Sequence, residues 1–337
     1  MPSSKDIRFI GIDGGGTKTA CMIGDGLGNV LAVCYGASSS IKSNSREVVQ
    51  EVLLSLIQQA LALSNSTESQ LEGVFLGLAG ADRPEDKVQI LSLLEGKLPA
   101  SVVITLHNDA ITALSAGTWG EAGIVLISGT GSIAYGFVPE ASISVRVGGW
   151  GYMLGDEGSG FNMSQQALIA VMKQHDGRGP HTKLTSYILD QLSLTDPNQI
   201  VTYVYGQANI RTAIAVLSKI VLQAAKEDDA VALEIVDQAV KELAQIAITA
   251  KARLQQLQPN QDMSDLPLLL SGGLFSDSWF QTCFESQQDI MNSKLKVSKL
   301  EVPPVTGCYV LALKQAGIAI TDALKTQIRA WETRRET

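Results

Sequence analysis

The sequence contains few cysteines, and their arrangement argues against several classes of protein. Four are present among 337 residues: Cys21, Cys34, Cys283 and Cys308. They form no CxxC pair and lack the spacing that zinc-binding or disulfide-rich domains use. We therefore expect free, reduced thiols and a cytoplasmic protein.

Long apolar runs and an excess of positive charge are also absent. No run reaches the roughly 20 apolar residues that a membrane helix needs. The opening segment MPSSKDIRF has no apolar stretch of the kind that a signal peptide contains. The net charge is −8, which disfavours nucleic acid as a partner. We expect neither a membrane nor a nucleic-acid partner.

The length and composition indicate a packed protein of about two domains. A chain of 337 residues exceeds the size of one typical core. Hydrophobic residues make up 45% and charged residues 18%, which is ordinary for a globular protein.

A glycine-rich loop lies near the N-terminus, in the segment RFIGIDGGGTKTACMIGDG (8–26). Short apolar runs at 7–13, 17–24 and 29–35 predict three strands, with the glycines between the first two. The turn signal Asp-Gly-Leu-Gly separates the second run from the third, which predicts a hairpin.

This loop differs from the two common nucleotide-binding loops. Gly11 and Gly16 have the spacing of a Walker loop, but Thr17 stands where that loop has its lysine. A strand follows instead of a helix, so the helix N-terminus that binds phosphate in Walker and dinucleotide-binding turns is missing.

The loop nevertheless has the chemistry of a phosphate site. Glycines let backbone N–H groups converge on an anion, and hydroxyl and ammonium groups add donors. The residues predicted to bind phosphate are Gly14, Gly15, Gly16, Thr17 and Lys18, with Thr19 as a further hydroxyl donor. Asp13 would repel phosphate unless Mg²⁺ lies between them, directly or through water. The alternative is a glycine-rich hairpin without a ligand.

The same pattern of strand, glycine loop, strand, turn and strand returns at residue 123. The segment GIVLISGTGS (123–132) is followed by predicted strands at 132–138 and 142–149. The loop residues predicted to bind phosphate here are Gly129, Thr130, Gly131 and Ser132. Gly129 lies 115 positions after Gly14, so the chain contains a long internal repeat.

A third glycine motif ends the strand predicted in LPLLLSGGLF (266–275). Gly272 and Gly273 would allow close approach of a base or ribose. The repeat predicts two related α/β domains with a cleft between them, where two facing loops clamp a polyphosphate. The alternative is that two hairpins recur by chance.

The motifs DGGGTKT, ISGTGS and LSGGLF resemble, in this order, the two phosphate motifs and the adenosine motif of the sugar kinase/Hsp70/actin superfamily. The segment GGWGYMLGDEGSG (148–160) resembles the N-acetylglucosamine kinase group of the BadF/BadG/BcrA/BcrD ATPase family. The resemblance covers the whole chain.

This resemblance implies two actin-like ATPase domains of the ribonuclease H-like type, with mixed sheets flanked by helices. We expect one domain at 1–118 plus 306–337 and the other at 119–305, the second with a helical insertion. The implied activity is transfer of phosphate from ATP, with Mg²⁺, to the 6-hydroxyl group of N-acetylglucosamine. A homodimer is also expected, because dimers are common among the resembled kinases.

Asp109 is the candidate catalytic base. It follows the buried strand VVITLHND (102–109), precedes a predicted helix, and matches the catalytic aspartate position of the family. The alternative is that Asp109 only caps that helix. His107, beside it, is expected to be a structural neighbour.

The resemblance implies that Asp156 binds the sugar, which suits a carboxylate because it accepts hydrogen bonds from adjacent hydroxyl groups. By resemblance, Gly149, Trp150 and Gly151 surround it. Core packing is the alternative for Trp150, and a role at a helix start is the alternative for Glu157.

The loop YGASSSIKSNS (35–45) departs from the family pattern. Ser40 stands where the resembled kinases have a sugar-reading asparagine, and Asn44 follows four positions later. We still expect Ser40 to contact the sugar, with Gly80 of LAGADRP (78–84) also lining that site.

Other functions remain open from the sequence. Glucosamine and N-acetylmuramic acid are the alternative acceptor sugars. The same family includes activators of 2-hydroxyacyl-CoA dehydratases, which need exposed cysteines for a bridging iron–sulfur cluster. A third alternative is a sugar sensor that lacks catalysis.

Overall fold

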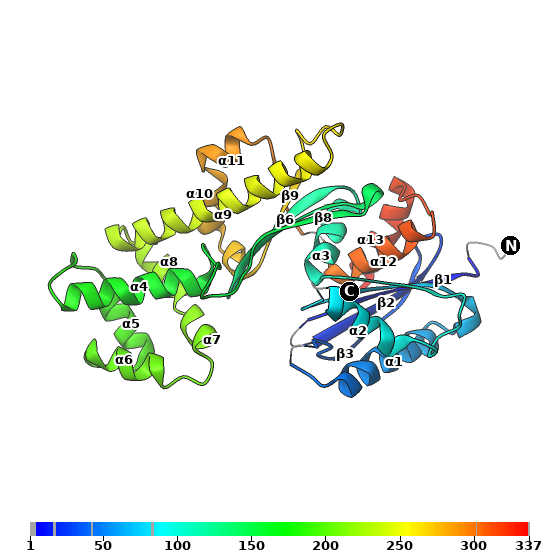
Figure 1. Ribbon diagram of the computed structural model, residues 1–337, viewed down its shortest axis with the longest axis horizontal. Helices are drawn as coiled ribbons and strands as arrows, with labels where there is room; N and C mark the ends of the chain where they lie inside the picture. The colour runs from blue at the N-terminus through cyan, green and yellow to red at the C-terminus, as the bar shows by residue number, and fades with distance from the viewer. Residues whose placement is uncertain (1–4, 16–17, 42, 82–83, 301, 336–337) are drawn as a thin grey trace. The chain divides into compact units, whose positions relative to one another are not determined.

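The computed structural model describes residues 5–15, 18–41, 43–81, 84–300 and 302–335. The chain divides into two compact units (Figure 1). Unit 1 comprises Met1–Gly123 and Lys299–Thr337, and unit 2 comprises Ile124–Ser298.

Unit 1 contains a five-stranded sheet in the order β3-β2-β1-β4-β5. The strands are β1 (Arg8–Gly14), β2 (Lys18–Asp25), β3 (Val30–Ala37), β4 (Leu71–Leu78) and β5 (Val103–His107). Strand β1 pairs antiparallel with β2 and parallel with β4, and β4 pairs parallel with β5. The sheet is therefore mixed, with β1 at its centre.

The helices of unit 1 follow their sequence signals. Ser45 caps the first, accepting a hydrogen bond from the Val48 N–H at 3.4 Å. They are α1 (Arg46–Leu63), α2 (Pro84–Leu94), α3 (Asp109–Thr118), α12 (Pro304–Gln315) and α13 (Asp322–Arg335), with a short 3₁₀ turn at Glu68–Gln70.

Both faces of strand β1 are covered. Side chains of a strand alternate between faces, and Ile10 and Ile12 lie in the buried cluster that also contains the apolar face of α1. Gly11 points the other way, where a Cβ atom would come within 2.3 Å of the Tyr309 backbone nitrogen of α12. The central strand is thus buried between helices, which explains its nearly continuous apolar sequence.

Helices α3 and α12 pack unusually closely. A Cβ atom added at Gly307 of α12 would lie 1.9 Å from the Thr112 carbonyl oxygen of α3. A Cβ atom at Gly77 of β4 would lie 2.1 Å from the Thr112 methyl carbon. The glycines at these positions therefore set how near α3 and its first residue, Asp109, come to the sheet.

Unit 2 repeats the strand order of unit 1. Its sheet runs β10-β9-β6-β7-β8, which places the first hairpin strand at the centre in the same way. The strands are β6 (Gly123–Ser128), β7 (Ser132–Val138), β8 (Ile143–Gly148), β9 (Pro267–Ser271) and β10 (Lys296–Lys299). Strand β6 pairs parallel with β9, whereas β7 and β8 are antiparallel. The predicted α/β class with two mixed sheets is confirmed.

A helical segment separates the hairpin of unit 2 from β9, at the point where unit 1 has α1 (Figure 1). It contains α4 (Gly160–His175), α5 (Leu184–Leu192), α6 (Asn198–Tyr205), α7 (Ile210–Ala215), α8 (Ser218–Lys226) and α9 (Ala230–Leu257). After β9 come η3 (Gly273–Ser276), α10 (Ser278–Glu285) and α11 (Gln288–Asn292), and η2 (Pro139–Ala141) joins β7 to β8. Within the described residues, no helix is long and apolar enough to cross a membrane.

The close packing of α3 on α12 gives a first prediction. Gly307→Ala places a methyl group against the Thr112 carbonyl, so we expect the free energy of unfolding to fall by about 2–3 kcal/mol. Thermal unfolding followed by circular dichroism measures the change.

Gly96→Asn is the matched control. Gly96 has a φ of +68° and no atom within 4 Å of a Cβ position. Asparagine tolerates that conformation, so the control should unfold close to wild type. An unchanged unfolding temperature for Gly307→Ala would contradict the packing argument.

Candidate functional site

The predicted site residues of unit 1 follow strands that end at the same edge of the sheet. Gly14 of β1 is in register with Leu78 of β4, and Gly77 of β4 is in register with His107 of β5. These three strands are parallel, so their carboxyl ends lie together. Ligands of open α/β sheets bind at that edge.

Asp13 and Asp109 interact at this edge. Burial, and next the charge of Asp109, raise the pKa of Asp13 from its usual 3.8 to about 7. The Thr112 hydroxyl donates to the Asp109 carbonyl oxygen at 2.7 Å and lies 3.4 Å from Asp13 Oδ1. Two carboxylates are thus held close enough to repel each other.

These two carboxylates fit a divalent cation. Mg²⁺ prefers oxygen ligands and keeps several waters, so one or two carboxylates and the substrate phosphates are enough to hold it. A cation beside Asp13 would also relieve the repulsion that raises its pKa. Among the described residues, no group of three or more His, Cys, Asp or Glu side chains could hold a metal ion by itself.

Asn108, and not Asp109, caps helix α3. The Asn108 Oδ1 atom accepts the Ala110 N–H at 2.8 Å, and Asp109 is the first residue of the helix. The Asp109 side chain is therefore not the cap of this helix. His107 stacks on Phe75 with parallel rings 5.6 Å apart.

The environment of His107 keeps it neutral. Burial, together with the positive charge of Lys87, lowers the His107 pKa to about 4. A base with so low a pKa is poorly matched to neutral pH.

The loop that follows β3, within YGASSSIKSNS (35–45), packs against the first glycine loop. The Ser38 hydroxyl donates to the Gly15 carbonyl at 3.0 Å. The Asn44 side-chain amide donates to the Ser38 hydroxyl at 3.1 Å and to the Ser40 carbonyl at 3.1 Å. Asn44 thus holds the loop together, and Ser40 itself is buried.

The other predicted phosphate residues of unit 1 lie in different settings. Thr19 is buried, and its hydroxyl lies 2.7 Å from the Ala37 carbonyl oxygen and 2.9 Å from the Ser39 hydroxyl. The expectation that Thr19 offers a donor to phosphate is therefore wrong, because neighbouring strands use that hydroxyl. Lys18 is exposed, with its ammonium group 5.8 Å from the centre of the Tyr35 ring.

Part of the predicted site falls outside the described residues, namely Gly16 and Thr17 of the first loop. Asp82 and Arg83, in the segment LAGADRP that follows β4, also lie outside them. Gly80, just before, has a φ of +86°, which suits a glycine at the turn that ends β4.

In unit 2, the second glycine loop is tied to the GDEGS segment. The Gly160 N–H donates to the Gly129 carbonyl at 2.7 Å. The Ser128 hydroxyl donates to the Gly158 carbonyl at 2.9 Å, and the Ser132 hydroxyl donates to the Glu157 carbonyl at 2.6 Å. The two most specific motifs of unit 2 therefore form one hydrogen-bonded substructure.

The third motif meets the second at the ends of parallel strands. Ile127 of β6 is in register with Ser271 of β9. A Cβ atom on Gly129 would lie 3.7 Å from the Gly273 nitrogen, and one on Gly272 would lie 2.3 Å from the Ser128 oxygen. Close backbone contact thus requires the glycines at this edge.

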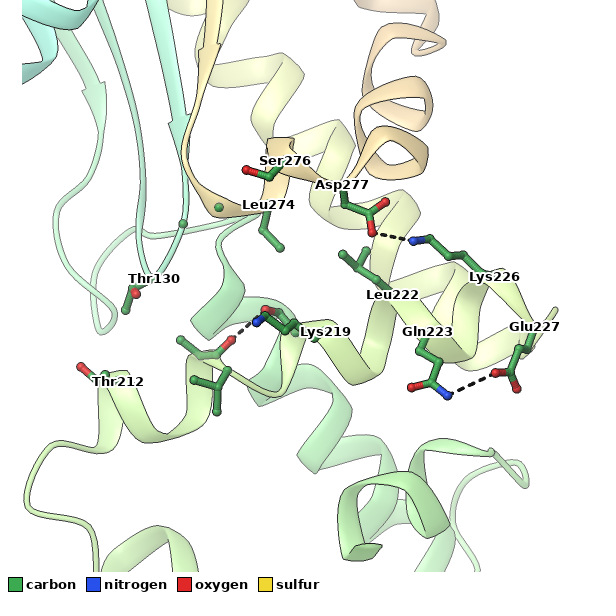
Figure 2. Close-up of a pocket in the computed structure, with 15 residues that line it drawn as sticks. Thr130, Thr212, Lys219, Leu222, Gln223, Lys226, Glu227, Leu274, Ser276 and Asp277 are labelled. Atoms are coloured by element: carbon green, nitrogen blue, oxygen red, sulfur yellow. Dashed lines mark hydrogen bonds and ion pairs between the residues drawn. The ribbon is translucent and has the colours of Figure 1, made fainter. Parts of the chain in front are cut away.

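A pocket of about 830 Å³ opens beside these two motifs (Figure 2). The glycine motifs contribute Gly129, Thr130 and Gly273, and the rest of the wall comes from α7, α8 and the segment that enters α10. Lys226 of α8 reaches toward Asp277, with 2.5 Å between the ammonium nitrogen and Oδ2 (Figure 2). Gly131, Ser132 and Gly272 do not line this pocket.

No sequence motif indicates the part of the pocket wall that α7 and α8 form. Thr212, Lys219, Leu222 and Gln223 line the pocket, yet they lie in an insertion without a glycine motif. The available signal was the apolar face of α8, which buries Val221, Leu222, Ala224 and Ala225 and looks like any core helix.

The predicted sugar segment of unit 2 is largely exposed. Trp150 is 60% exposed, and the Arg146 guanidinium carbon lies 4.6 Å from the centre of its ring. The alternative that Trp150 packs in the core is therefore wrong. Gly149 and Gly151 flank it with φ angles of +69° and +95°.

Asp156 is buried and paired with a residue that the sequence did not indicate. Its Oδ2 lies 3.0 Å from Nη2 of Arg211. Burial raises the pKa of Asp156 above its usual value, and the charge of Arg211 and the backbone N–H groups of Ser132 and Gly151 offset only part of that rise.

Comparisons with known proteins identify the family. Residues 10–308 match the model of the BadF/BadG/BcrA/BcrD ATPase family. The chain therefore belongs to that family, as its motifs predicted.

Relatives and solved structures extend the comparison. An N-acetylmuramic acid/N-acetylglucosamine kinase of Clostridium acetobutylicum is 33% identical over 304 residues, covering 90% of this chain and 97% of the relative. An N-acetyl-D-glucosamine kinase of Dictyostelium discoideum is 37% identical over 210 residues, covering 60% of this chain and 65% of the relative. The crystal structure of a candidate N-acetylglucosamine kinase from Chromobacterium violaceum superimposes with a TM-score of 0.66 at 25% identity, covering 91% of this chain and 99% of that one.

The raised pKa of Asp13 predicts how stability depends on pH. The unfolded chain releases this proton near pH 4 and the folded chain near pH 7, so stability falls as pH rises through that window. Asp13→Asn removes the titration. Without divalent cations, the variant should therefore unfold at a higher temperature than wild type at pH 8.

Thermal unfolding between pH 4 and pH 8 in a chelating buffer measures this difference. Glu72→Gln, on the exposed part of β4, is the control and should follow wild type. A lower unfolding temperature for Asp13→Asn at pH 8 would show that its carboxylate stabilises the fold, contrary to this account.

Proposed function

We propose that the chain is an ATP-dependent amino-sugar kinase that phosphorylates the 6-hydroxyl group of N-acetylglucosamine. The observation that carries this proposal is the pocket of about 830 Å³, whose wall contains Thr130 of the second glycine motif and Gly273 of the third. Small-molecule sites have volumes of about 300–1,000 Å³. The family and the sugar kinases among the relatives support the same activity.

The pocket is proposed to take the adenosine of ATP, with the phosphates at the glycine loops. The proposed phosphate residues are Gly14, Gly15, Gly16, Thr17 and Lys18 of unit 1 and Gly129, Thr130, Gly131 and Ser132 of unit 2, with Gly272 and Gly273 toward the adenosine. Mg²⁺ beside Asp13, directly or through water, would neutralise charge on the phosphates.

Asp109 is the proposed general base. The sugar 6-hydroxyl oxygen attacks the γ-phosphorus, the bond from that phosphorus to the bridging oxygen of ADP breaks, and Asp109 accepts the hydroxyl proton. Such help is worth about 10²–10⁴-fold in rate. Its place at the start of α3, beside the cap Asn108, fixes its backbone for this task.

Asp156 is proposed to bind the sugar through its hydroxyl groups. Ser40, Gly80, Gly149, Trp150 and Gly151 are proposed to complete this site. Ser40 is proposed for its position in the loop after β3, and its side chain is buried.

Other acceptor sugars than N-acetylglucosamine also have support. The Clostridium relative is named for both N-acetylmuramic acid and N-acetylglucosamine, so N-acetylmuramic acid is the second candidate and glucosamine the third. The activator function has less support, because Cys21, Cys34 and Cys308 are buried and Cys283 is half-buried. Bridging cluster ligands must be exposed.

We also propose the other properties that the sequence predicts. They are a homodimer, a cytoplasmic location, no nucleic-acid or membrane partner, and a division into domains at 1–118 plus 306–337 and 119–305.

ADP release measured with Mg²⁺ across a panel of hexoses and amino sugars tests the function. We expect the highest rate with N-acetylglucosamine. Activity confined to N-acetylmuramic acid or glucosamine would change the acceptor and keep the mechanism. Hydrolysis of ATP that is independent of sugar, or no ADP release at all, would refute the kinase.

Asp109→Asn tests the base. The variant should fold normally and lose about 10²–10⁴-fold in turnover, because the amide cannot accept the hydroxyl proton. Steady-state kinetics at saturating ATP and sugar measure this loss. Asn108→Ser, which keeps a capping oxygen, is the control and should retain activity. Turnover close to wild type for Asp109→Asn would remove Asp109 as the base.

A further inference from the structure

Arg211 lies where the GDEGS segment and the second glycine loop meet. It is the second residue of α7, and its Nη2 donates to Asp156 Oδ2 at 3.0 Å. The Asp156 side chain is 3% exposed, whereas that of Arg211 is 42% exposed. The ion pair thus extends from the protein interior to the surface.

The pair packs directly on the phosphate loop. A Cβ atom at Gly131 would lie 2.2 Å from Arg211 Nη2 and 2.9 Å from Asp156 Oδ2. No side chain fits between the loop and the pair. The guanidinium group and the carboxylate therefore occupy the space beside Gly131.

Arg211 is the cation that lies against the Asp156 carboxylate. The carboxylate also receives the backbone N–H groups of Ser132, from β7, and Gly151, from the segment after β8. These donors are neutral, and Arg211 is the cation that acts on it from α7. Burial alone would raise the pKa of Asp156, and the arginine opposes that rise.

The other groups around Asp156 do not replace this cation. Helix α4 begins with neutral residues and has no acid in its first turn. Glu157 is the other acid that lines a small hollow of about 150 Å³ with Asp156, and Arg146 of β8 lies over Trp150. The hollow leaves room for a hydroxyl group to reach the carboxylate.

Arg211 is not placed as a structural arginine usually is. Its Nε atom is buried and has no hydrogen-bond partner among the described residues. Buried donors are normally satisfied, so the fold accepts the cost of one orphaned N–H group in order to hold the guanidinium against Asp156 and Gly131.

We propose that Arg211 is a positioning residue for phosphoryl transfer: it holds the Asp156 carboxylate in place against the second phosphate loop. The proposal rests on the kinase function above. It implies that sugar affinity, more than ATP affinity, depends on Arg211, because Asp156 is the group that Arg211 orients.

Kinetics of Arg211→Gln and Arg211→Lys test this, using the sugar that wild type phosphorylates best. For Arg211→Gln we expect kcat/KM for the sugar to fall about 10- to 100-fold, with the KM for ATP changed less than about two-fold. The acidic limb of its pH profile should move to higher pH, because loss of the cation raises the Asp156 pKa. Arg211→Lys should recover part of both effects.

Arg178→Gln is the matched control, because Arg178 also pairs with an aspartate, Asp176, but on the surface of the same unit. It should behave as wild type. Equal losses for sugar and ATP with an unmoved pH profile would make Arg211 a purely structural residue and overturn the proposal, as would wild-type kinetics for Arg211→Gln. If Arg211→Gln does not fold, the pH profile of Arg211→Lys decides. Wild type without sugar-dependent ADP release would instead refute the kinase itself, and this proposal with it.

Discussion

The proximity of Asp13 and Asp109 is the constraint on which unit 1 depends. Burial and mutual repulsion raise the pKa of Asp13, so the fold must hold two acids where they oppose each other. The parallel ends of β1 and β5 supply the positions, and the close packing of α12 on α3 at Gly307 prevents α3 from retreating. In the proposed mechanism, the stability lost at this edge would keep both carboxylates in place before substrate arrives, as preorganised catalysis requires.

Unit 2 meets the same problem of a buried acid in a different way. Asp156 receives backbone N–H groups and the charge of Arg211, which offset part of the effect of its burial. Asp13 has no comparable cation within the described part of unit 1, apart from the exposed Lys18. In the proposed mechanism, Asp13 would receive a metal ion with the nucleotide, and Asp156 would accept hydrogen bonds from the sugar. Two copies of one topology have acquired different electrostatics.

Local patterns carried most of what could be predicted. Glycines after buried strands, turn residues between apolar runs and the GDEGS segment are short-range signals, and they gave the mixed sheets and the family. The cap of α3 was ambiguous because Asn108 and Asp109 are both good caps. Trp150 was ambiguous because an aromatic residue between glycines suits a core or a surface. The Asp156–Arg211 pair was invisible because it joins residues 55 positions apart, and no local pattern encodes such a contact.

The path of the chain has a consequence for biosynthesis. Unit 2 is one continuous segment, whereas unit 1 is built from both ends of the chain. Helix α12 follows β10 in sequence yet covers the Gly11 face of β1. A ribosome therefore releases all of unit 2 before the Gly11 face of the central strand of unit 1 can be buried. We expect this to reverse the usual order, in which the N-terminal domain folds first, and to leave one face of the nascent first sheet open to aggregation until the last helices emerge.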